Sequence, residues 1–526
     1  MFEAGYEALL VALDPSRLLW LAFGASVGLV VGILPGLGGT VGMAILLPFV
    51  FGMDPFSGIA LLMGMAAVVH TGDTFPSVLL GVPGSSGSQA TIMDGYPLAQ
   101  QGEAGRALGA AFIVSMLGGL IGAVTLFAIV GVARPLILAL GAPELFMFAM
   151  LGLSMVGVLS RGSPAAGFVS GLLGMLVGII GLAPQVGQYR FVFDQLYLYD
   201  GVPIAVVALG LFALPEMVDL VAANRSISQT TELKGGRMEG LRDVLKNKLL
   251  VVRSSMLGTG LGIIPGVGGS VVDWIVYGIT KQSSRDNERF GDGDIRGVIG
   301  PESANNAKEG GALIPTLLFG IPGSGTTAML LGGLLLLGIQ PGPSMVTTNL
   351  DATLSIAWSL ALANVLGTMG CLLLAKQVSK LSLIPAKVLT PFLLVIMTVA
   401  AYQATRNWGD IIAFLVIGLL GWGMKQVGFP RAPMLIGFVL AVSAERYLHL
   451  SMSLYDFEWF TRPIVITVFV LILLVLFGSS ARELQKRRAG RHAGSGLGGG
   501  PTEDDDGSPS SASGSTDTGT DEGTDR

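Results

Sequence analysis

The sequence has few of the residues that form disulfides, hold metals or bind nucleotide phosphates. Its 526 residues include one cysteine, Cys371, and three widely spaced histidines, His70, His449 and His492. One cysteine excludes an intramolecular disulfide and a cysteine-based metal cluster. No Gly-Lys dipeptide occurs, which excludes a P-loop ATPase within this chain. We therefore expect no catalytic centre, no metal and no resident cofactor.

Charged residues are also scarce, at 13% of the chain, about half the usual share of a soluble domain. Hydrophobic residues make up 51%, the mean hydropathy is +0.69, and 77 glycines accompany 26 prolines. A soluble globule of this length needs more charge to cover its surface. The composition predicts an all-α polytopic membrane protein with many helix breaks or close helix contacts.

Apolar runs that suit a bilayer of roughly 30 Å occur along most of the chain. The candidate spans are 16–34, 40–70, 108–131, 135–160, 164–183, 201–223, 249–264, 267–280, 311–340, 350–375, 388–404, 407–424, 430–447 and 462–479. We divide the chain into a first transmembrane repeat (1–222), a basic linker (223–253), a second repeat with extra C-terminal spans (254–480) and a disordered tail (481–526), basic and then acidic.

Basic residues predict the orientation in a cytoplasmic (inner) membrane. Seven lysines and arginines lie in 223–253 and five in 480–492, so we expect both segments, and the C-terminus, in the cytoplasm. The first fifteen residues hold three acids and no base, which predicts an external N-terminus and argues against a cleavable signal peptide.

Two motifs occur twice in the same order. The segment 32–40 (GILPGLGGT) returns as 262–270 (GIIPGVGGS), 230 positions later, and 76–85 (PSVLLGVPGS) returns as 315–324 (PTLLFGIPGS), 239 positions later. This predicts an internal duplication, with inverted topology if the two halves start on opposite sides of the membrane.

Proline and glycine in these motifs predict broken helices and re-entrant hairpins at bilayer depth. A break exposes the N–H groups of a helix N-terminus, which suit a carboxylate. The predicted substrate site comprises Pro35, Gly36, Gly38, Gly39, Thr40, Pro83, Gly84, Ser85, Ser86, Pro265, Gly266, Gly268, Gly269, Ser270, Pro322, Gly323, Ser324 and Thr326, together with Asn305 and Asn306. The alternative is that the small residues only allow tight helix packing.

Few ionisable residues lie inside the apolar regions, and such residues usually have a function. Asp73 and Asp273 are candidates for binding a coupling Na⁺ or H⁺, although residues 70–75 could instead form an aqueous loop end. Asn305 and Asn306 could contact a carboxylate or Na⁺, or cap a helix. We expect Glu302, Lys308 and Glu309 to pair with one another across a loop.

These motifs resemble the large membrane subunit of the tripartite tricarboxylate transporters, the TctA family, over about residues 16–480. The resemblance is carried by 32–52, 84–109, 262–278 and 301–343. It implies a permease that imports an organic carboxylate with a coupling cation, Na⁺ or H⁺. It also implies two partners, a small four-helix membrane subunit and an extracytoplasmic solute-binding protein, and no nucleic acid.

Two other functions compete with a symporter. A channel or a non-transporting scaffold could contain the same broken helices, although two broken sites related by repetition favour gated alternating access. An intramembrane serine protease is suggested by Gly84-Ser85-Ser86-Gly87, but the matching segment Gly323-Ser324-Gly325-Thr326 lacks that pattern.

Overall fold

The structure is a computed structural model that describes residues 2–34, 37–159, 163–222, 236–381 and 386–476. Pro35, Gly36, the first part of the predicted basic linker (223–235) and the predicted tail (481–526) lie outside the described residues. The described part is helical apart from a short antiparallel hairpin formed by β1 (Gly181–Ala183) and β2 (Gln188–Arg190). The predicted all-helical architecture is confirmed for these ranges.

The helices follow one another with short connections. The first half contains α1 (Phe2–Ala12), α2 (Pro15–Ile33), α3 (Gly38–Leu46), η1 (Leu47–Val50), α4 (Pro55–Gly72), α5 (Thr74–Leu80), α6 (Ile92–Gln100), α7 (Ala104–Leu138), α8 (Ala142–Leu159), α9 (Pro164–Gly178), η2 (Leu196–Leu198), α10 (Ile204–Ala208), η3 (Leu209–Ala213) and α11 (Leu214–Ala222). The second half contains α12 (Arg237–Lys246), α13 (Lys248–Gly262), α14 (Gly269–Ser283), α15 (Arg296–Phe319), α16 (Gly325–Leu336), η4 (Pro343–Val346), α17 (Leu350–Leu381), α18 (Ala386–Gln403), α19 (Trp408–Gln426), α20 (Ala432–Tyr455) and η5 (Glu458–Thr461).

Six helical segments are long and apolar enough to cross a membrane. They are Pro15–Ile33, Pro55–Leu80, Ala104–Leu138, Leu350–Ala375, Trp408–Gln426 and Ala432–Tyr455. Shorter apolar helices, such as Gly38–Val50 and Gly325–Leu336, lie between them. The chain is therefore a multi-pass membrane protein. The single span predicted at 40–70 is divided, because Pro48 begins a 3₁₀ turn and Asp54 caps a new helix at Pro55.

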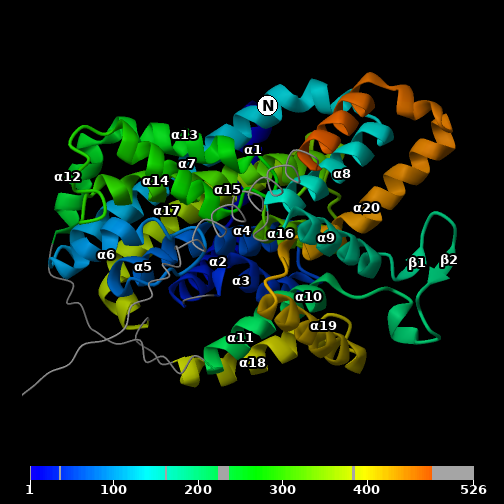
Figure 1. Cartoon of the computed structure of the whole chain (residues 1–526), viewed down its shortest axis with the longest axis horizontal. Coiled ribbons are helices and arrows are strands. Elements are labelled where there is room, and N and C mark those ends of the chain that lie inside the picture. Colours follow the sequence, from blue (N-terminus) through cyan, green and yellow to red (C-terminus); the bar gives the residue numbers. More distant parts are fainter. Residues whose placement is uncertain (1, 35–36, 160–162, 223–235, 382–385, 477–526) are drawn as a thin grey trace, which may run out of the picture. The chain divides into compact units, whose positions relative to one another are not determined.

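Helix α15 corrects the prediction for residues 301–309. We expected a polar loop or helix cap there, but the segment lies inside one continuous helix that is buried from Gly297 to Leu318. Glu302 and Asn306 find partners on other helices, so the helix tolerates these polar side chains without facing solvent. α15 packs against α7, α13 and α14, as Figure 1 also shows.

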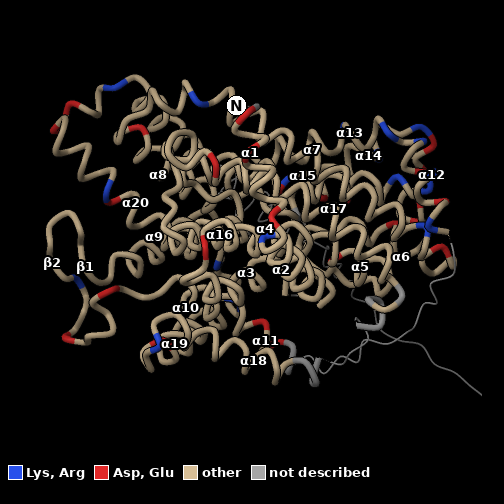
Figure 2. Tube along the Cα trace, turned by 180° about the vertical axis from the view of Figure 1, so that it is seen from behind, with Lys and Arg blue, Asp and Glu red and all other residues tan. Residues whose placement is uncertain are grey.

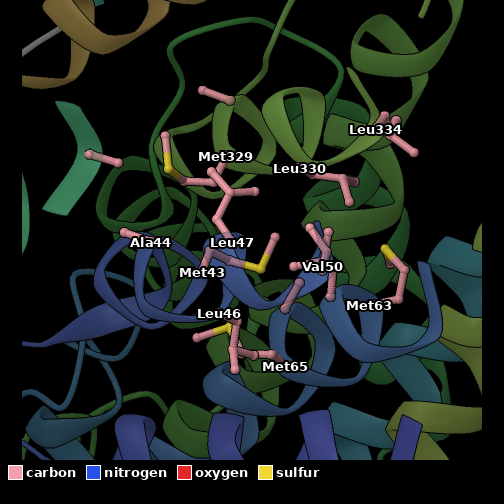
Figure 3. Close-up of a cluster of buried hydrophobic side chains, with 14 of the residues drawn as sticks. Met43, Ala44, Leu46, Leu47, Val50, Met63, Met65, Met329, Leu330 and Leu334 are labelled. Carbon is pink, nitrogen blue, oxygen red and sulfur yellow. The ribbon is translucent and has the colours of Figure 1, made fainter. Parts of the chain in front are cut away.

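An apolar core joins the two halves of the sequence. Helix α3 contributes Met43, η1 contributes Leu47, α4 contributes Met63, and α16 contributes Met329 and Leu330, all at most 1% exposed. Figure 3 shows these side chains pointing toward one another between the three helices. This contact holds α16 beside α3. The motif 315–324, which precedes α16, therefore lies close to the motif 32–40, in which α3 begins.

Charged residues concentrate at a few places in the described part. Figure 2 shows acidic and basic residues near α12 and α6, near the β-hairpin and the outer part of α20, and near α11 and α19. The helices between these places are mostly uncharged, as a bilayer requires. The few charged residues inside the helix bundle are described below.

Candidate functional site

A cavity of about 520 Å³ lies between the four repeated motifs. Among the predicted substrate-site residues, its walls include Gly38, Gly39, Thr40, Pro83, Gly84, Ser85, Ser86, Gly266, Gly268, Gly269, Gly323, Ser324 and Thr326. Segments that are about 230 positions apart in sequence thus face the same space. A cavity of this size holds a small organic acid.

Three helices begin at this cavity. α3 begins at Gly38, α14 at Gly269 and α16 at Gly325, and all three residues line the wall. The first N–H groups of each helix have no intrahelical acceptor, and the helix dipole makes this end positive. Ser324 caps α16, accepting from the Thr327 N–H at 3.2 Å, whereas Leu37 and Gly268 provide no side-chain cap for α3 and α14. The cavity therefore offers uncapped amides to an anion.

The second-half break is held by a direct contact between its two motifs. The Gly266 N–H donates to the Gly323 carbonyl at 3.1 Å. Gly266 has φ +83°, a left-handed conformation that glycine adopts without strain, and the backbone of Val156 lies where a side chain would project. Gly266 thus fixes the path of the chain between α13 and α14.

Four other predicted substrate-site residues that the structure describes, Pro265, Pro322, Asn305 and Asn306, are not part of the cavity wall. Pro35 and Gly36 are outside the described residues, Pro265 and Pro322 adjoin wall residues, and the Ser270 side chain is not described. Asn305 and Asn306 are buried in α15. Asn306 Nδ2 donates to Thr71 Oγ1 at 3.0 Å and to Asn364 Oδ1 at 2.7 Å, which ties α15 to α4 and α17. Neither asparagine caps the helix, because α15 begins nine residues earlier, at Arg296.

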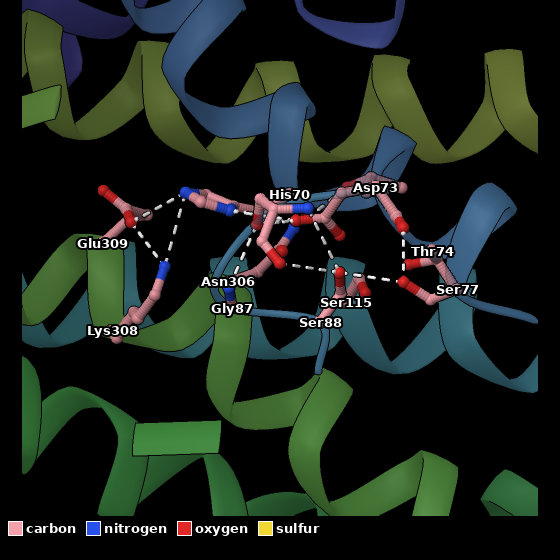
Figure 4. Close-up of polar contacts among 12 residues, drawn as sticks. His70, Asp73, Thr74, Ser77, Gly87, Ser88, Ser115, Asn306, Lys308 and Glu309 are labelled. Atoms are coloured by element: carbon pink, nitrogen blue, oxygen red, sulfur yellow. Dashed lines mark hydrogen bonds and ion pairs between the residues drawn. The ribbon is translucent and has the colours of Figure 1, made fainter. Parts of the chain in front are cut away.

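A buried ionic cluster forms part of the cavity wall (Figure 4). Lys308 Nζ lies 2.6 Å from Glu309 Oε1, and His70 Nε2 lies 3.0 Å from the same oxygen. The Lys308 Nζ and His70 Nε2 atoms are 3.4 Å apart. Lys308 and Glu309 do pair, as the sequence predicted, but on a buried helix rather than across a loop. Glu302 is not their partner, since Thr74, Thr91 and Ser115 hydroxyls donate to it.

The two coupling-ion candidates lie behind the wall. Asp73 is fully buried between α4 and α5, where it accepts a hydrogen bond from Ser85 Oγ, and its Oδ2 lies 3.5 Å from His70 Nδ1. Asp273 is 1% exposed in α14, and its Oδ2 accepts from the Ala90 N–H at 2.6 Å. Residues 70–75 are buried, so the aqueous loop end considered for them is wrong.

A second charged group lines another part of the cavity, and the sequence did not predict it. Arg431 donates to Glu216 Oε1 at 3.0 Å, and its guanidinium carbon lies 5.4 Å from the centre of the Phe212 ring. Lys425 donates to the other Glu216 oxygen at 2.7 Å. Arg431 and Glu216 line the cavity and remain partly exposed, so this group lies toward its opening.

One regularity in the sequence could have identified the buried cluster. His70 and Glu309 are separated by 239 positions, the interval between the two PGS motifs. Applying that interval to every ionisable residue would have paired them. No comparable signal points to Arg431 and Glu216, which lie outside both motif pairs.

Comparison with known proteins identifies the family. Residues 18–436 match the tripartite tricarboxylate transporter TctA family. An Agrobacterium vitis protein described as an uncharacterized 52.8 kDa protein in the TAR-I ttuC' 3' region is 33% identical over 452 residues, which cover 85% of this chain and 89% of that protein. A second A. vitis protein, described as uncharacterized in the TAR-II ttuC' 3' region, is 35% identical over 195 residues, covering 37% and 81% respectively. No solved structure matches. The chain belongs to the TctA family of tripartite tricarboxylate transporters and is a non-enzymatic membrane subunit of such a system.

Proposed function

We propose that this chain is the permease of a binding-protein-dependent transporter that imports a tricarboxylate or another organic carboxylate together with a coupling cation. The observation that carries the proposal is the cavity of about 520 Å³ enclosed by all four motifs, with three helix N-termini on its wall. Amide N–H groups at helix ends bind carboxylates in low-dielectric surroundings without a buried arginine for each one. Lys308 and Arg431 place an ammonium and a guanidinium group on the same wall, where each is paired with an acid, Glu309 and Glu216 respectively.

The two halves of the permease, in this proposal, descend from an inverted duplication and move against each other in alternating access. Support comes from contacts that recur at the motif intervals of 230 and 239 positions. Close contacts of Gly28 with Met65 and of Gly32 with Val69 correspond to those of Gly258 with Ala304 and of Gly262 with Lys308. Two contacts between α2 and α4 therefore recur between α13 and α15 at the spacing of the repeated motifs.

Orientation and partners complete the proposal. Basic residues around α12 and in 480–492 favour the cytoplasmic side for the start of α13 and for the C-terminus, in the inner membrane. The acidic, base-free first fifteen residues favour an external start for α2, which makes the repeats inverted. The partners are a small four-helix membrane subunit and an extracytoplasmic solute-binding protein, which delivers the carboxylate to the outer side.

Reconstitution tests the proposal. The chain is placed in proteoliposomes with the small membrane subunit and the binding protein encoded beside it, and uptake of radiolabelled di- and tricarboxylates is measured under imposed Na⁺ and proton gradients. We expect uphill uptake that requires all three proteins and one of the gradients. Downhill flux that continues without any gradient or binding protein would instead indicate a channel.

A further inference from the structure

The loop 84–91, which follows the first PGS motif, is held by three buried acidic side chains. Asp73 accepts from Ser85 Oγ, Asp273 Oδ2 accepts from the Ala90 N–H at 2.6 Å, and Glu302 Oε1 accepts from Thr91 Oγ1 at 2.7 Å. The exposed fractions of the three acids are 0%, 1% and 0%. They come from three different parts of the chain and meet at one short loop.

These acids are poorly balanced by positive charge. Among the ion pairs of the described residues, none joins a lysine or arginine to Asp73, Asp273 or Glu302. The nearest bases are His70, 3.5 Å from Asp73, and Lys308, which already pairs with Glu309. Unpaired charge inside a membrane protein is costly and is normally compensated. The cluster therefore requires additional positive charge when its acids are ionised.

Several buried oxygens in this cluster also lack a hydrogen-bond partner. They are Asp73 Oδ1, Asp273 Oδ1 and Asn305 Oδ1. The Asn305 side chain lies against Gly87, in the middle of the same loop, and is 1% exposed. A buried oxygen without a hydrogen-bond partner destabilises the folded protein unless a ligand satisfies it. Three of them around one loop provide lone pairs for a cation, and hard cations prefer carboxylate, amide and backbone oxygens.

The other half of the chain lacks these acids at the matching positions. At the intervals of 230 and 239, the positions matching Asp73, Asp273, Glu302 and Asn305 are Ala312, Met43, Met63 and Ala66, all buried. The matching segment, 323–330, is not a loop of the same kind, because helix α16 begins at Gly325. The buried acids and Asn305 therefore accompany the half in which this segment is a loop, and they concentrate negative charge beside the loop 84–91.

We propose that the loop 84–91 encloses a Na⁺ site whose ligands are Asp73, Asp273, Asn305 and backbone carbonyls of the loop, with Glu302 adding negative charge. Na⁺ is favoured over a proton because one of the free oxygens belongs to an amide, which does not bind protons at neutral pH. Among the described residues, no three His, Cys, Asp or Glu side chains lie close enough together to hold a metal ion. The proposed Na⁺ coordination shell therefore includes the Asn305 amide oxygen and loop carbonyls. Unwound backbone serves this purpose in other transporters.

This site would couple the cation to the substrate, and so it rests on the proposed function. Ser85 and Ser86 of the same loop line the carboxylate cavity. Na⁺ bound behind the loop would fix the position of these residues and reduce the ordering cost of substrate binding. Only one such site is expected per chain, because the second half lacks the acids.

The experiment measures ²²Na⁺ binding to the purified full chain in nanodiscs, without substrate or partners. Wild type is compared with Asp73→Asn, Asp273→Asn and Asn305→Ala, with Asp410→Asn as the control. Asp410 is equally buried but caps α19, accepting from Thr405 Oγ1 at 2.7 Å. Because a variant could be misfolded, the Na⁺-dependent shift in melting temperature, relative to K⁺, is measured on the same samples. Asn305→Ala removes no charge and so tests the site without altering the ionic cluster.

We expect saturable Na⁺ binding by wild type and Asp410→Asn, and at least tenfold weaker binding by the three site variants, each with a smaller Na⁺-dependent thermal shift. Absence of saturable binding in wild type, or unchanged binding in folded site variants, would overturn the site. The reconstituted system separates this outcome from failure of the permease. Carboxylate uptake that depends on a proton gradient and not on Na⁺ would reject the Na⁺ site and support the permease. Na⁺ binding without any carboxylate uptake would support the Na⁺ site and reject the permease.

Discussion

His70 Nε2 lies 3.0 Å from Glu309 Oε1, and the two residues are separated by the interval of 239 positions that separates the repeated PGS motifs. In the proposed inverted duplication, residues at matching positions touch each other only near the axis that relates the two halves. The proposed movement of one half against the other would therefore change the His70–Glu309 contact. Lys308, which pairs with Glu309, lines the cavity at the same place.

Replacing Gly266 by leucine tests the broken helix. A leucine at φ +83° is strained and would collide with the backbone of Val156, so the turn between α13 and α14 must shift. We expect at least a tenfold loss of carboxylate uptake with normal membrane insertion, measured by uptake and by the amount of folded protein in the membrane. Gly260→Leu is the matched control, since no atom lies near the added side chain. Equal uptake by the two variants would contradict a functional break.

The buried pair of Lys308 and Glu309 can be tested by a double-mutant cycle. Lys308→Met leaves Glu309 buried without its ammonium partner, which costs about 3–5 kcal/mol. The double variant Lys308→Met/Glu309→Met removes both charges, so we expect it to recover much of that loss in free energy of unfolding. Denaturant titration of the purified chain measures both. Losses in free energy of unfolding by Lys308→Met and Glu309→Met that add up to the loss of the double variant would show that the pair is not coupled.

Arg431 is expected to attract the anionic substrate toward the cavity. In Arg431→Gln, Glu216 keeps one cationic partner, because Lys425, which also pairs with Asp219, still lies 2.7 Å from it, so the local structure should survive. We expect the half-saturating substrate concentration to rise about tenfold, equivalent to about 1.4 kcal/mol, with little change in maximal rate. Concentration-dependent uptake at several ionic strengths measures this effect, which should shrink with added salt.

Arg446→Gln is the control for Arg431. Arg446 is bonded to Gln340, 2.8 Å away, and is not part of the cavity wall. An unchanged half-saturating substrate concentration in Arg431→Gln, or an equal increase of it in both variants, would show that Arg431 does not attract the substrate.

Much of the helical architecture could be predicted because glycine and proline mark where helices must end. The described ends of α2 at Ile33 and of α13 at Gly262 lie inside the repeated motifs. Composition predicted a membrane protein, and six helices are long and apolar enough to span a bilayer. The β-hairpin at 181–190 was missed, since two three-residue strands carry too little periodicity to be recognised.

The polar interior could not be predicted in the same way. Glu302 and Asn306 look like loop residues in sequence, because their partners Thr74, Thr71 and Asn364 are distant in the chain. Only tertiary packing shows that a helix carrying them can be buried. The charged group of Arg431 and Glu216 depends on α11 and α20 meeting, which local patterns do not encode.

The central claim is that the cavity between the four motifs holds the transported carboxylate, and Ser86 tests it most directly. Ser86 lines the cavity and is exposed within it. Cys371 is the chain's one cysteine and is buried, so Ser86→Cys in a Cys371→Ser background carries a single reactive thiol. Thr348→Cys, at an exposed position outside the cavity wall, is the control.

The measurement is the rate of thiol labelling of the reconstituted chain with and without carboxylate substrate, followed by uptake. We expect substrate to slow labelling of Ser86→Cys but not of Thr348→Cys, and labelling of Ser86→Cys to abolish uptake. A labelling rate that substrate leaves unchanged, with full uptake after complete modification, would contradict the claim.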